Sequence, residues 1–213
     1  GFSLSMGSAK PGEYPTAPLA DGYDGAAVKL TTRSTGPFGA MVNKRIAAGN
    51  LFIGTFDMAS ALTDAMKATH FGQVFDRQPM KLTGYYTYQP GKDFQDPKGN
   101  TVADRTDQAA IYAVLYRNHD EQGNAVTLYG DNVKTSPQIV AIADMGMVKP
   151  KKEWTPFSIN FNYLSDIDLD LLRQRGYSLT IVFSSSADGD RFEGAIGSTL
   201  CVDKVRLVCK KEQ

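Results

Sequence analysis

The residues of this chain that could do acid–base chemistry include three carboxylates in one loop. Asp188, Asp190 and Glu193 share the loop A-D-G-D-R-F-E-G, and a pair of facing carboxylates is what glycoside hydrolysis requires. The glycines that follow Asp188 and Glu193 are equally typical of turns. We therefore favour turn formation for this loop and keep glycoside hydrolysis as an alternative.

A second polar loop, between positions 92 and 108, has the oxygen ligands that a hard cation such as Ca²⁺ would need. Its candidate ligands are Asp93, Asp96, Asn100, Asp104 and Asp107. Their spacing does not match the D-x-[DN]-x-[DN]-G pattern of a calcium-binding loop. The sequence therefore favours a plain surface loop over a metal site.

The remaining catalytic residue types show no convergent pattern. The two histidines, His70 and His119, lie in unrelated contexts, and neither fits a metal-binding spacing such as H-E-x-x-H. The run Ser184–Ser186 resembles a nucleophile only in composition, because no activating base can be named. The sequence also lacks a G-x-S-x-G elbow, a P-loop and a dinucleotide fingerprint, so we expect no enzyme activity.

Side chains suited to sugar binding lie on segments that are predicted to be strands. Carbohydrate-binding surfaces combine aromatic rings with amide and hydroxyl groups that hydrogen-bond sugar hydroxyls. The candidates of this kind are Tyr85, Tyr88, Trp154, Ser158, Asn160 and Asn162. Tyrosine and tryptophan are also common in the cores of β-sandwiches, so a core position stays open for each aromatic candidate.

The segment that must position several of these candidates is Trp154–Tyr163, W-T-P-F-S-I-N-F-N-Y. From Phe157 onward, aromatic and aliphatic residues alternate with Ser158, Asn160 and Asn162. A period of two predicts a half-buried strand with its polar side exposed. Tyr177–Ser184 shows the same alternation, and two such strands need an opposing sheet to bury their apolar sides.

Other segments with strand patterns extend along the whole chain. They are Ala26–Thr32, Leu51–Phe56, Lys81–Gln89, Ala110–Arg117, Val126–Tyr129, Gln138–Ala143 and Thr199–Cys209. Ala110–Arg117 is apolar at both parities, which predicts a central strand covered on both faces. We expect an all-β fold, a two-sheet antiparallel β-sandwich of the jelly-roll type.

The predicted strands are joined without a linker, so residues 1–213 are expected to form a single domain with residues 1–25 as an extended lead-in. Met58–Lys67 is either a short helix or an irregular crossover. A single helical turn is possible at Asp168–Arg175, closed by Gly176.

Composition excludes some classes of partner. The formal net charge is zero, with 23 basic and 23 acidic residues, which favours neither nucleic acid nor an anionic membrane surface. No apolar run approaches the ~20 residues of a membrane span. Cys201 and Cys209 lie on one predicted strand about 26 Å apart, beyond disulfide reach, so we expect free thiols that leave the redox compartment undecided.

Three stretches together resemble a known family. They are Tyr14–Thr16 with Gly22–Thr32, then Ala47–Phe56 with Arg77–Gly91, and finally Phe183–Val208. The last contains the pattern G-A-x-G-S-x-L-x-V-D-x-V. The chain, from about Tyr14 onward, is similar to the putative carbohydrate metabolism domain of Bacteroidetes surface and periplasmic proteins.

The resemblance implies a jelly roll similar to carbohydrate-binding modules, and no catalytic set is transferred with it. It also implies an exported protein, periplasmic or on the outer-membrane surface and possibly a lipoprotein, with a partner domain upstream of Gly1. Jelly-roll modules of this kind often hold a structural Ca²⁺ near the closing strand. Asp203 is the candidate ligand, although it could instead form a hydrogen bond that holds the lead-in segment.

The expected function is non-catalytic binding of a glycan, either a polysaccharide or an oligosaccharide. The alternatives are a structural or adhesive module that binds protein and, less favoured, a glycoside hydrolase. An exposed aromatic platform beside Asn160 and Asn162 would favour the first, and a smooth charged face the second. Two carboxylates facing each other across a cleft would favour the third.

Overall fold

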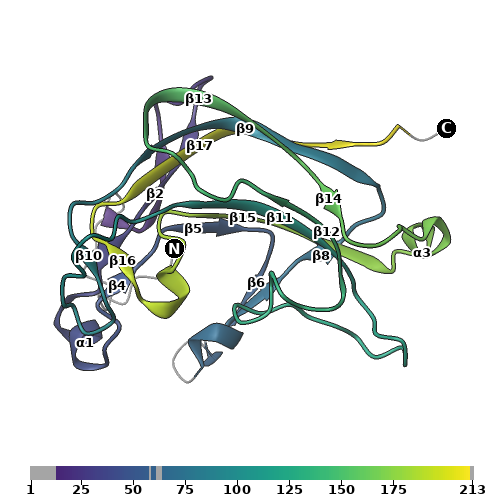
Figure 1. The fold of residues 1–213 in the computed structure, drawn as a ribbon, viewed down its shortest axis with the longest axis horizontal. Coiled ribbons are helices and arrows are strands. Elements are labelled where there is room, and N and C mark those ends of the chain that lie inside the picture. The colour runs from purple at the N-terminus through teal and green to yellow at the C-terminus, as the bar shows by residue number, and fades with distance from the viewer. Residues whose placement is uncertain (1–12, 58, 61–63, 212–213) are drawn as a thin grey trace.

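The structure, a computed structural model, describes residues 13–57, 59–60 and 64–211. Its two large sheets pack face to face (Figure 1). The five-stranded sheet has the order β1 (Thr16–Leu19), β2 (Ala27–Thr31), β17 (Thr199–Cys209), β9 (Pro79–Gln89) and β13 (Lys151–Asn160). The six-stranded sheet has the order β14 (Asn162–Tyr163), β12 (Ile139–Asp144), β11 (Ala110–Arg117), β15 (Tyr177–Ser184) and β5 (Asn50–Phe52), and β8 (Gln73–Val74) also pairs with β15.

Smaller elements close the ends of the sandwich and cover one of its faces. The short strand pairs are β3 (Arg33–Ser34) with β4 (Ile46–Ala47), β6 (Gly54–Phe56) with β7 (Thr69–Phe71), and β10 (Phe94–Gln95) with β16 (Gly194–Ala195). The helical segments are α1 (Gly36–Met41), the 3₁₀ turn Ala65–Lys67, α3 (Leu169–Arg173) and the 3₁₀ turn Gly189–Arg191. The strand pairs are antiparallel, and the prediction of an all-β two-sheet sandwich is confirmed.

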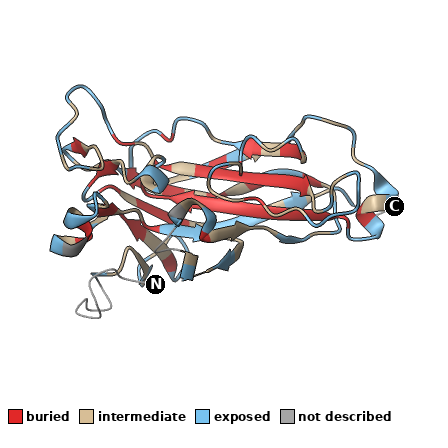
Figure 2. Ribbon diagram, turned by 90° about the horizontal axis from the view of Figure 1, so that it is seen from below, coloured by how far each residue is buried: buried red, intermediate tan, exposed pale blue. Residues whose placement is uncertain are grey.

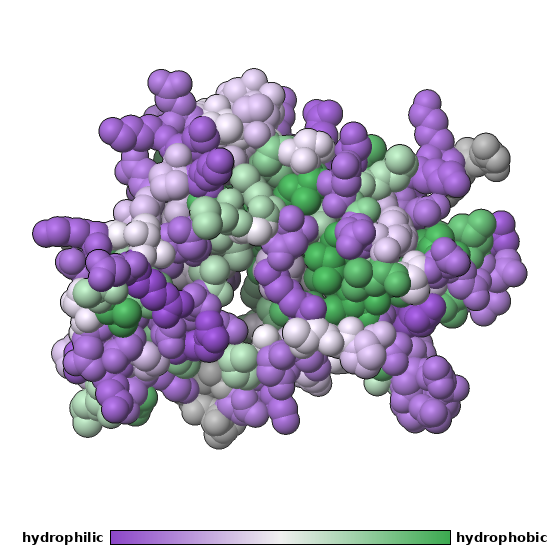
Figure 3. Space-filling view, viewed as in Figure 1, coloured by the Kyte–Doolittle hydropathy of each residue, from purple (hydrophilic) through white to green (hydrophobic). Residues whose placement is uncertain are grey.

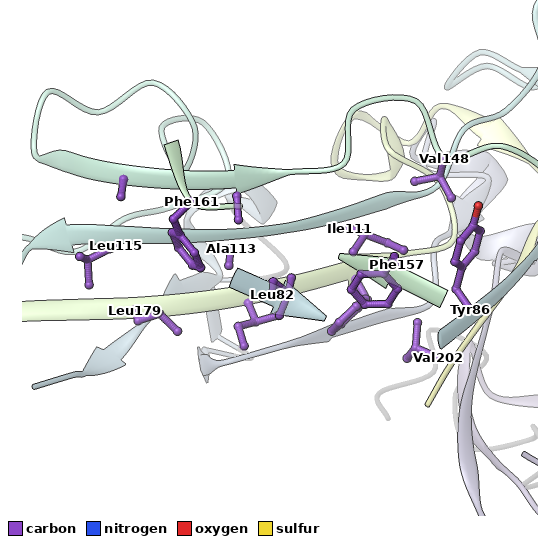
Figure 4. Close-up of a cluster of buried hydrophobic side chains, with 14 of the residues drawn as sticks. Leu82, Tyr86, Ile111, Ala113, Leu115, Val148, Phe157, Phe161, Leu179 and Val202 are labelled. Carbon is purple, nitrogen blue, oxygen red and sulfur yellow. The ribbon is translucent and has the colours of Figure 1, made fainter. Parts of the chain in front are cut away.

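The core lies between the two sheets, along the band of buried strand residues in Figure 2. On β9, alternate residues point inward, and Leu82, Tyr86 and Tyr88 are almost fully buried. Figure 4 shows Phe157 among the buried side chains of this region. Gly84 makes room for that ring, because a Cβ at this position would lie 2.8 Å from the ring atoms of Phe157.

A second apolar cluster covers the opposite, outer side of the six-stranded sheet. It contains Tyr112, Val114 and Tyr116 of β11, Val182 of β15, Ile139 of β12, and Leu128 and Val133 from the connection between β11 and β12. Strand β11 therefore has apolar cover on both faces, as its sequence predicts. The cover also changes the interpretation of β15, whose residues are all buried, so the prediction that Ser178, Thr180 and Ser184 face solvent is wrong.

The segment Trp154–Tyr163 is not one strand. It forms the end of β13 in the five-stranded sheet, passes Phe161, and enters the six-stranded sheet as β14. Phe161 is buried in the core at this crossing. Side chains alternate between the two faces on each side of Phe161, but the polar residues before and after Phe161 belong to different sheets.

Other predicted elements differ in detail from the structure. Leu51–Phe56 is divided between β5 and β6, and Gly54 allows a close approach to β7, because a Cβ there would lie 2.2 Å from the carbonyl oxygen of His70. Val126–Tyr129 forms no strand, and Leu128 makes an isolated bridge with Phe71 instead. Of the ambiguous segment Met58–Lys67, residues 58 and 61–63 lie outside the described residues.

The predicted helical turn is confirmed as α3, with an additional detail at its end. The Asp168 side chain caps its first turn by accepting hydrogen bonds from the backbone N–H groups of Asp170 and Leu171. The backbone N–H of Gly176 bonds to the carbonyl oxygen of Leu171, but Arg175 takes the left-handed conformation, with φ of 62°. Cys201 and Cys209 both lie on β17 as free thiols.

Candidate functional site

The outer face of the five-stranded sheet brings together several of the predicted sugar-binding residues. In the register between β13 and β9, Ser158 lies beside Thr83, and Asn160 lies beside Lys81. Cross-strand partners project from the same face of a sheet. We call this surface the open face and define it by Lys81, Thr83, Tyr85, Pro156, Ser158, Asn160, Asp203 and Arg206.

The polar side chains of β13 on the open face are available to a ligand. Ser158 and Asn160 are both exposed, and within the described residues neither side chain makes a hydrogen bond. Their neighbours on β13, Phe157 and Ile159, pack in the core or against it. The strand therefore fixes the two polar groups in place while leaving their hydrogen-bonding capacity unused.

Tyr85 is present on this face, but another ring covers it. Tyr23 from the lead-in stacks on Tyr85 with ring centroids 3.7 Å apart and an interplanar angle of 12°. Tyr23 itself is 47% exposed. The aromatic surface offered to solvent is therefore the stacked pair, and the sequence pattern identified only its inner member.

Asp203 holds the lead-in segment that carries Tyr23. Its Oδ2 accepts a hydrogen bond of 2.9 Å from the backbone N–H of Asp24, and Asp24 also forms an ion pair with Lys204. The hydrogen bond from Asp24 is the main reason that the pKa of Asp203 lies below its ordinary value. The alternative role considered for Asp203, a hydrogen bond to the lead-in, is thus observed.

Two of the predicted residues lie off the open face, and Trp154 has no register partner that would assign it to this face. Tyr88 is fully buried in the core, where burial raises the pKa of its hydroxyl, so the prediction that it contacts sugar is wrong. Asn162 pairs with Ile142 on β12, and Ile142 packs against the second apolar cluster on the other side of the sandwich. Trp154 is half-buried in the part of β13 where the register with β9 slips.

The serine run has a structural role in a buried cluster of polar groups. Asp107, 1% exposed, accepts hydrogen bonds from the hydroxyls of Ser186 and Ser198, both at 2.6 Å, and from the backbone N–H of Ala195 at 2.7 Å. Burial raises the pKa of this carboxyl. Because Ser186 is buried as well, it cannot act as a nucleophile on a substrate in solution.

The acidic loop is tied down by arginines. Arg105 bridges Asp188 at 2.6 Å and Glu193 at 2.9 Å, and Arg191 pairs with the other oxygen of Asp188. Two of the carboxylates considered for glycoside hydrolysis are therefore held in ion pairs. This agrees with the interpretation of the loop as a structural turn.

Comparison with known proteins places the chain in a family. Residues 1–208 match the family described as "Putative carbohydrate metabolism domain". The chain belongs to this family. The match to the family covers nearly the whole chain, so the resemblance found in the sequence is confirmed.

Two solved structures from Bacteroides are similar to this family member. One, described as "a putative glycoside hydrolase" from Bacteroides thetaiotaomicron, shares 42% identity and a TM-score of 0.92 over 98% of this chain and 61% of its own. Another, described in the same words, from Bacteroides vulgatus, shares 39% identity and a TM-score of 0.88 over 98% of this chain and 83% of its own. The chain thus spans less than two thirds of the first relative. No protein of curated function matches it.

One carboxylate of this family member is less firmly paired. Asp190 is an exposed residue, but neighbouring protein atoms partly desolvate its carboxyl and so raise its pKa. The Oδ2 of Asp144 accepts a hydrogen bond from the Lys134 ammonium at 2.7 Å. Both carboxylates contribute to raising the pKa of Tyr112, after burial, which is the largest cause.

No cluster of three or more histidine, cysteine, aspartate or glutamate side chains that could hold a metal ion occurs in residues 13–57, 59–60 and 64–211. In the second polar loop, the Asp96 carboxylate accepts hydrogen bonds from the backbone N–H and the side-chain amide of Asn100.

In the part of the chain that the structure describes, no helix is long and apolar enough to cross a membrane.

Proposed function

We propose that this protein is a non-catalytic glycan-binding module and that the open face is its binding surface. The observation that carries the proposal is that polar side chains without hydrogen bonds and a stacked pair of tyrosines lie on the same face of one sheet. Ser158 and Asn160 lie on β13, Tyr85 lies on the neighbouring β9, and Tyr23 covers Tyr85. Membership of a carbohydrate metabolism family supports the same class of ligand.

The chemistry of the open face suits a sugar chain. A pyranose ring has an apolar face that packs on an aromatic ring, and Tyr23 offers such a ring in a position fixed by Asp203. Amide and hydroxyl side chains can each donate and accept, which fits the vicinal hydroxyls of a sugar. The cationic groups Lys81 and Arg206 add further hydrogen-bond donors.

The competing function is a module that binds another protein through the same surface. Lys81 and Arg206 would then dominate, because rim charges steer association and make it sensitive to salt. Binding to a neutral glycan depends little on salt. The ionic-strength dependence of any complex therefore separates the two functions.

A glycan array followed by titration calorimetry tests the proposal. The variant Ser158→Ala/Asn160→Ala should weaken binding of the selected glycan by at least about tenfold, a loss of roughly 1.4 kcal/mol. Asn162→Ala is the matched control, because Asn162 is an exposed asparagine two residues away that lies on the other side of the sandwich. It should leave binding unchanged.

Equal loss in Asn162→Ala and in the double variant would contradict the assignment to the open face. Retention of full affinity by the double variant would do the same. Both variants should have a free energy of unfolding close to that of the parent protein, since exposed substitutions usually change stability by less than about 0.5 kcal/mol.

A second candidate function, glycoside hydrolysis, is favoured by Asp190. A carboxyl with a raised pKa can keep its proton and act as a general acid. Release of nitrophenol from aryl glycosides tests this function. The activity should disappear in Asp190→Asn and persist in Asp166→Asn, an exposed control, and absence of release from the parent protein would reject this candidate.

A further inference from the structure

The chain has an open pocket on the covered side of the sandwich, beside the second apolar cluster. Its volume is about 370 Å³, at the lower end of the range for small-molecule sites. Its wall is formed by β7, β8 and the turn that follows β11. Thr55 also lines it, and the hydroxyl-bearing ring of Tyr116 borders it.

Both histidines of the chain line this pocket. His70 comes from β7 and His119 from the turn after β11, which are far apart in the sequence. The Nδ1 of His119 lies 2.8 Å from the side-chain oxygen of Asn118. That oxygen can only accept, so Nδ1 is the donor in this contact.

Several polar groups that line the pocket have no partner among the described residues. The side chains of Gln73, Thr127 and Thr55 make no hydrogen bond there, and the imidazole of His70 contacts the ring of Tyr129, with centroids 5.1 Å apart. By contrast, Asn118 and Tyr116 are fixed by bonds to the backbone of Arg175 and Phe71. The pocket therefore combines a fixed frame with unused donors and acceptors.

The lining contains no lysine, arginine, aspartate or glutamate. A charged ligand would find no opposite permanent charge, whereas a neutral ligand with many hydroxyls would find amide, hydroxyl and imidazole partners. Phe71, Val126 and Val74 supply an apolar wall. An uncharged molecule with one apolar face and a rim of hydroxyls is the ligand that matches this lining.

We propose that this pocket binds a single neutral sugar residue, either free or at the end of a chain. It is separate from the open face, because Tyr116 and Ser178 of its lining belong to β11 and β15 of the six-stranded sheet. The pocket can therefore bind sugar whether or not the open face does, and the two sites fail or succeed independently in experiments.

The experiment uses His70 and His119 as reporters, because the chain contains no other histidine. Imidazole resonances of the full chain are followed by NMR at constant pH during titration with glucose, galactose, mannose, xylose and N-acetylglucosamine. Glucuronate and galacturonate serve as charged counterparts. We expect at least one neutral sugar to shift both imidazole signals saturably, with the uronates at least fivefold weaker.

Two variants locate the effect. Ala125→Trp places a large ring in the pocket and should abolish the shifts, whereas Ala103→Trp, at an exposed alanine outside the lining, should keep them. Gln73→Ala, which removes one exposed amide, should weaken binding at least threefold and covers the case in which Ala125→Trp does not fold. The proposal is overturned if no neutral sugar shifts the signals, if only uronates do, or if folded Ala125→Trp and Gln73→Ala bind like the parent.

Discussion

The two outer faces of this sandwich use similar strands in opposite ways. The outer side of the six-stranded sheet is covered by Leu128 and Val133 and has a pocket at its edge. The outer side of the five-stranded sheet carries exposed polar residues, crossed by the lead-in at Tyr23. Figure 3 shows one side of the molecule, where groups of hydrophobic residues lie among hydrophilic ones. Alternation of side chains therefore identifies a strand but does not tell which of its faces stays open.

Deleting the same methyl groups on the two faces should have the largest difference in effect. Val114→Ala, at a fully buried position of the second apolar cluster, should lower the free energy of unfolding by about 2–3 kcal/mol, because it removes buried area and leaves a cavity. Val208→Ala, at a valine 42% exposed on β17, should cost less than about 1 kcal/mol. Urea unfolding, which we expect to show one transition, measures both. Equal losses would mean that the two faces are not buried differently.

A finer test exchanges one hydroxyl on each face. The hydroxyl of buried Thr180 donates to the carbonyl oxygen of Ile53 at 2.9 Å. Thr180→Val should therefore cost about 1–2 kcal/mol, because a buried hydrogen bond is lost. Thr83→Val on the open face should be nearly neutral in the same unfolding assay, and a neutral Thr180→Val would contradict the burial of β15.

These two threonines show what the sequence could and could not predict. The segments that became β2, β9, β11, β12, β15 and β17 follow from local alternation and turn residues. Residues distant in sequence cover β15: Val182 packs in the second apolar cluster with Leu128, and Thr180 donates to the carbonyl oxygen of Ile53. No local pattern contains that information, so β15 was predicted to be half-exposed.

The candidate site was predicted in part for the same reason. Exposure of Ser158 and Asn160 follows from the period of two along β13. The crossing at Phe161 separates Asn162 from them, and the stacking of Tyr23 on Tyr85 joins residues 62 positions apart in the chain. Both depend on tertiary packing, which a single strand pattern does not encode.

A smaller effect concerns the lead-in that crosses the open face. The backbone N–H of Asp24 holds the pKa of Asp203 below its ordinary value, which is about 3.9 in an unfolded chain. The ionised carboxylate therefore stabilises the folded protein at neutral pH, and this contribution is lost as the pH falls through the lowered pKa. The difference in melting temperature between the parent and Asp203→Asn should be present at pH 6 and shrink below about pH 4. A difference that grows on acidification would contradict the hydrogen bond.

The smallest expected effect is that of reducing agent. Cys201 and Cys209 are free thiols on one strand, so the fold does not depend on a bridge between them. Dithiothreitol should leave the melting temperature unchanged within error. A marked fall would reveal a disulfide between two molecules.

Mapping a bound glycan on the protein tests directly whether the open face is the binding surface. The glycan selected on the array is titrated into isotope-labelled protein, and the backbone amide resonances are followed by NMR. We predict that the largest shifts cluster on the central parts of β9, β13 and β17 and at Tyr23. Shifts confined to the loops at the ends of the sandwich, with none on these strands, would contradict the account.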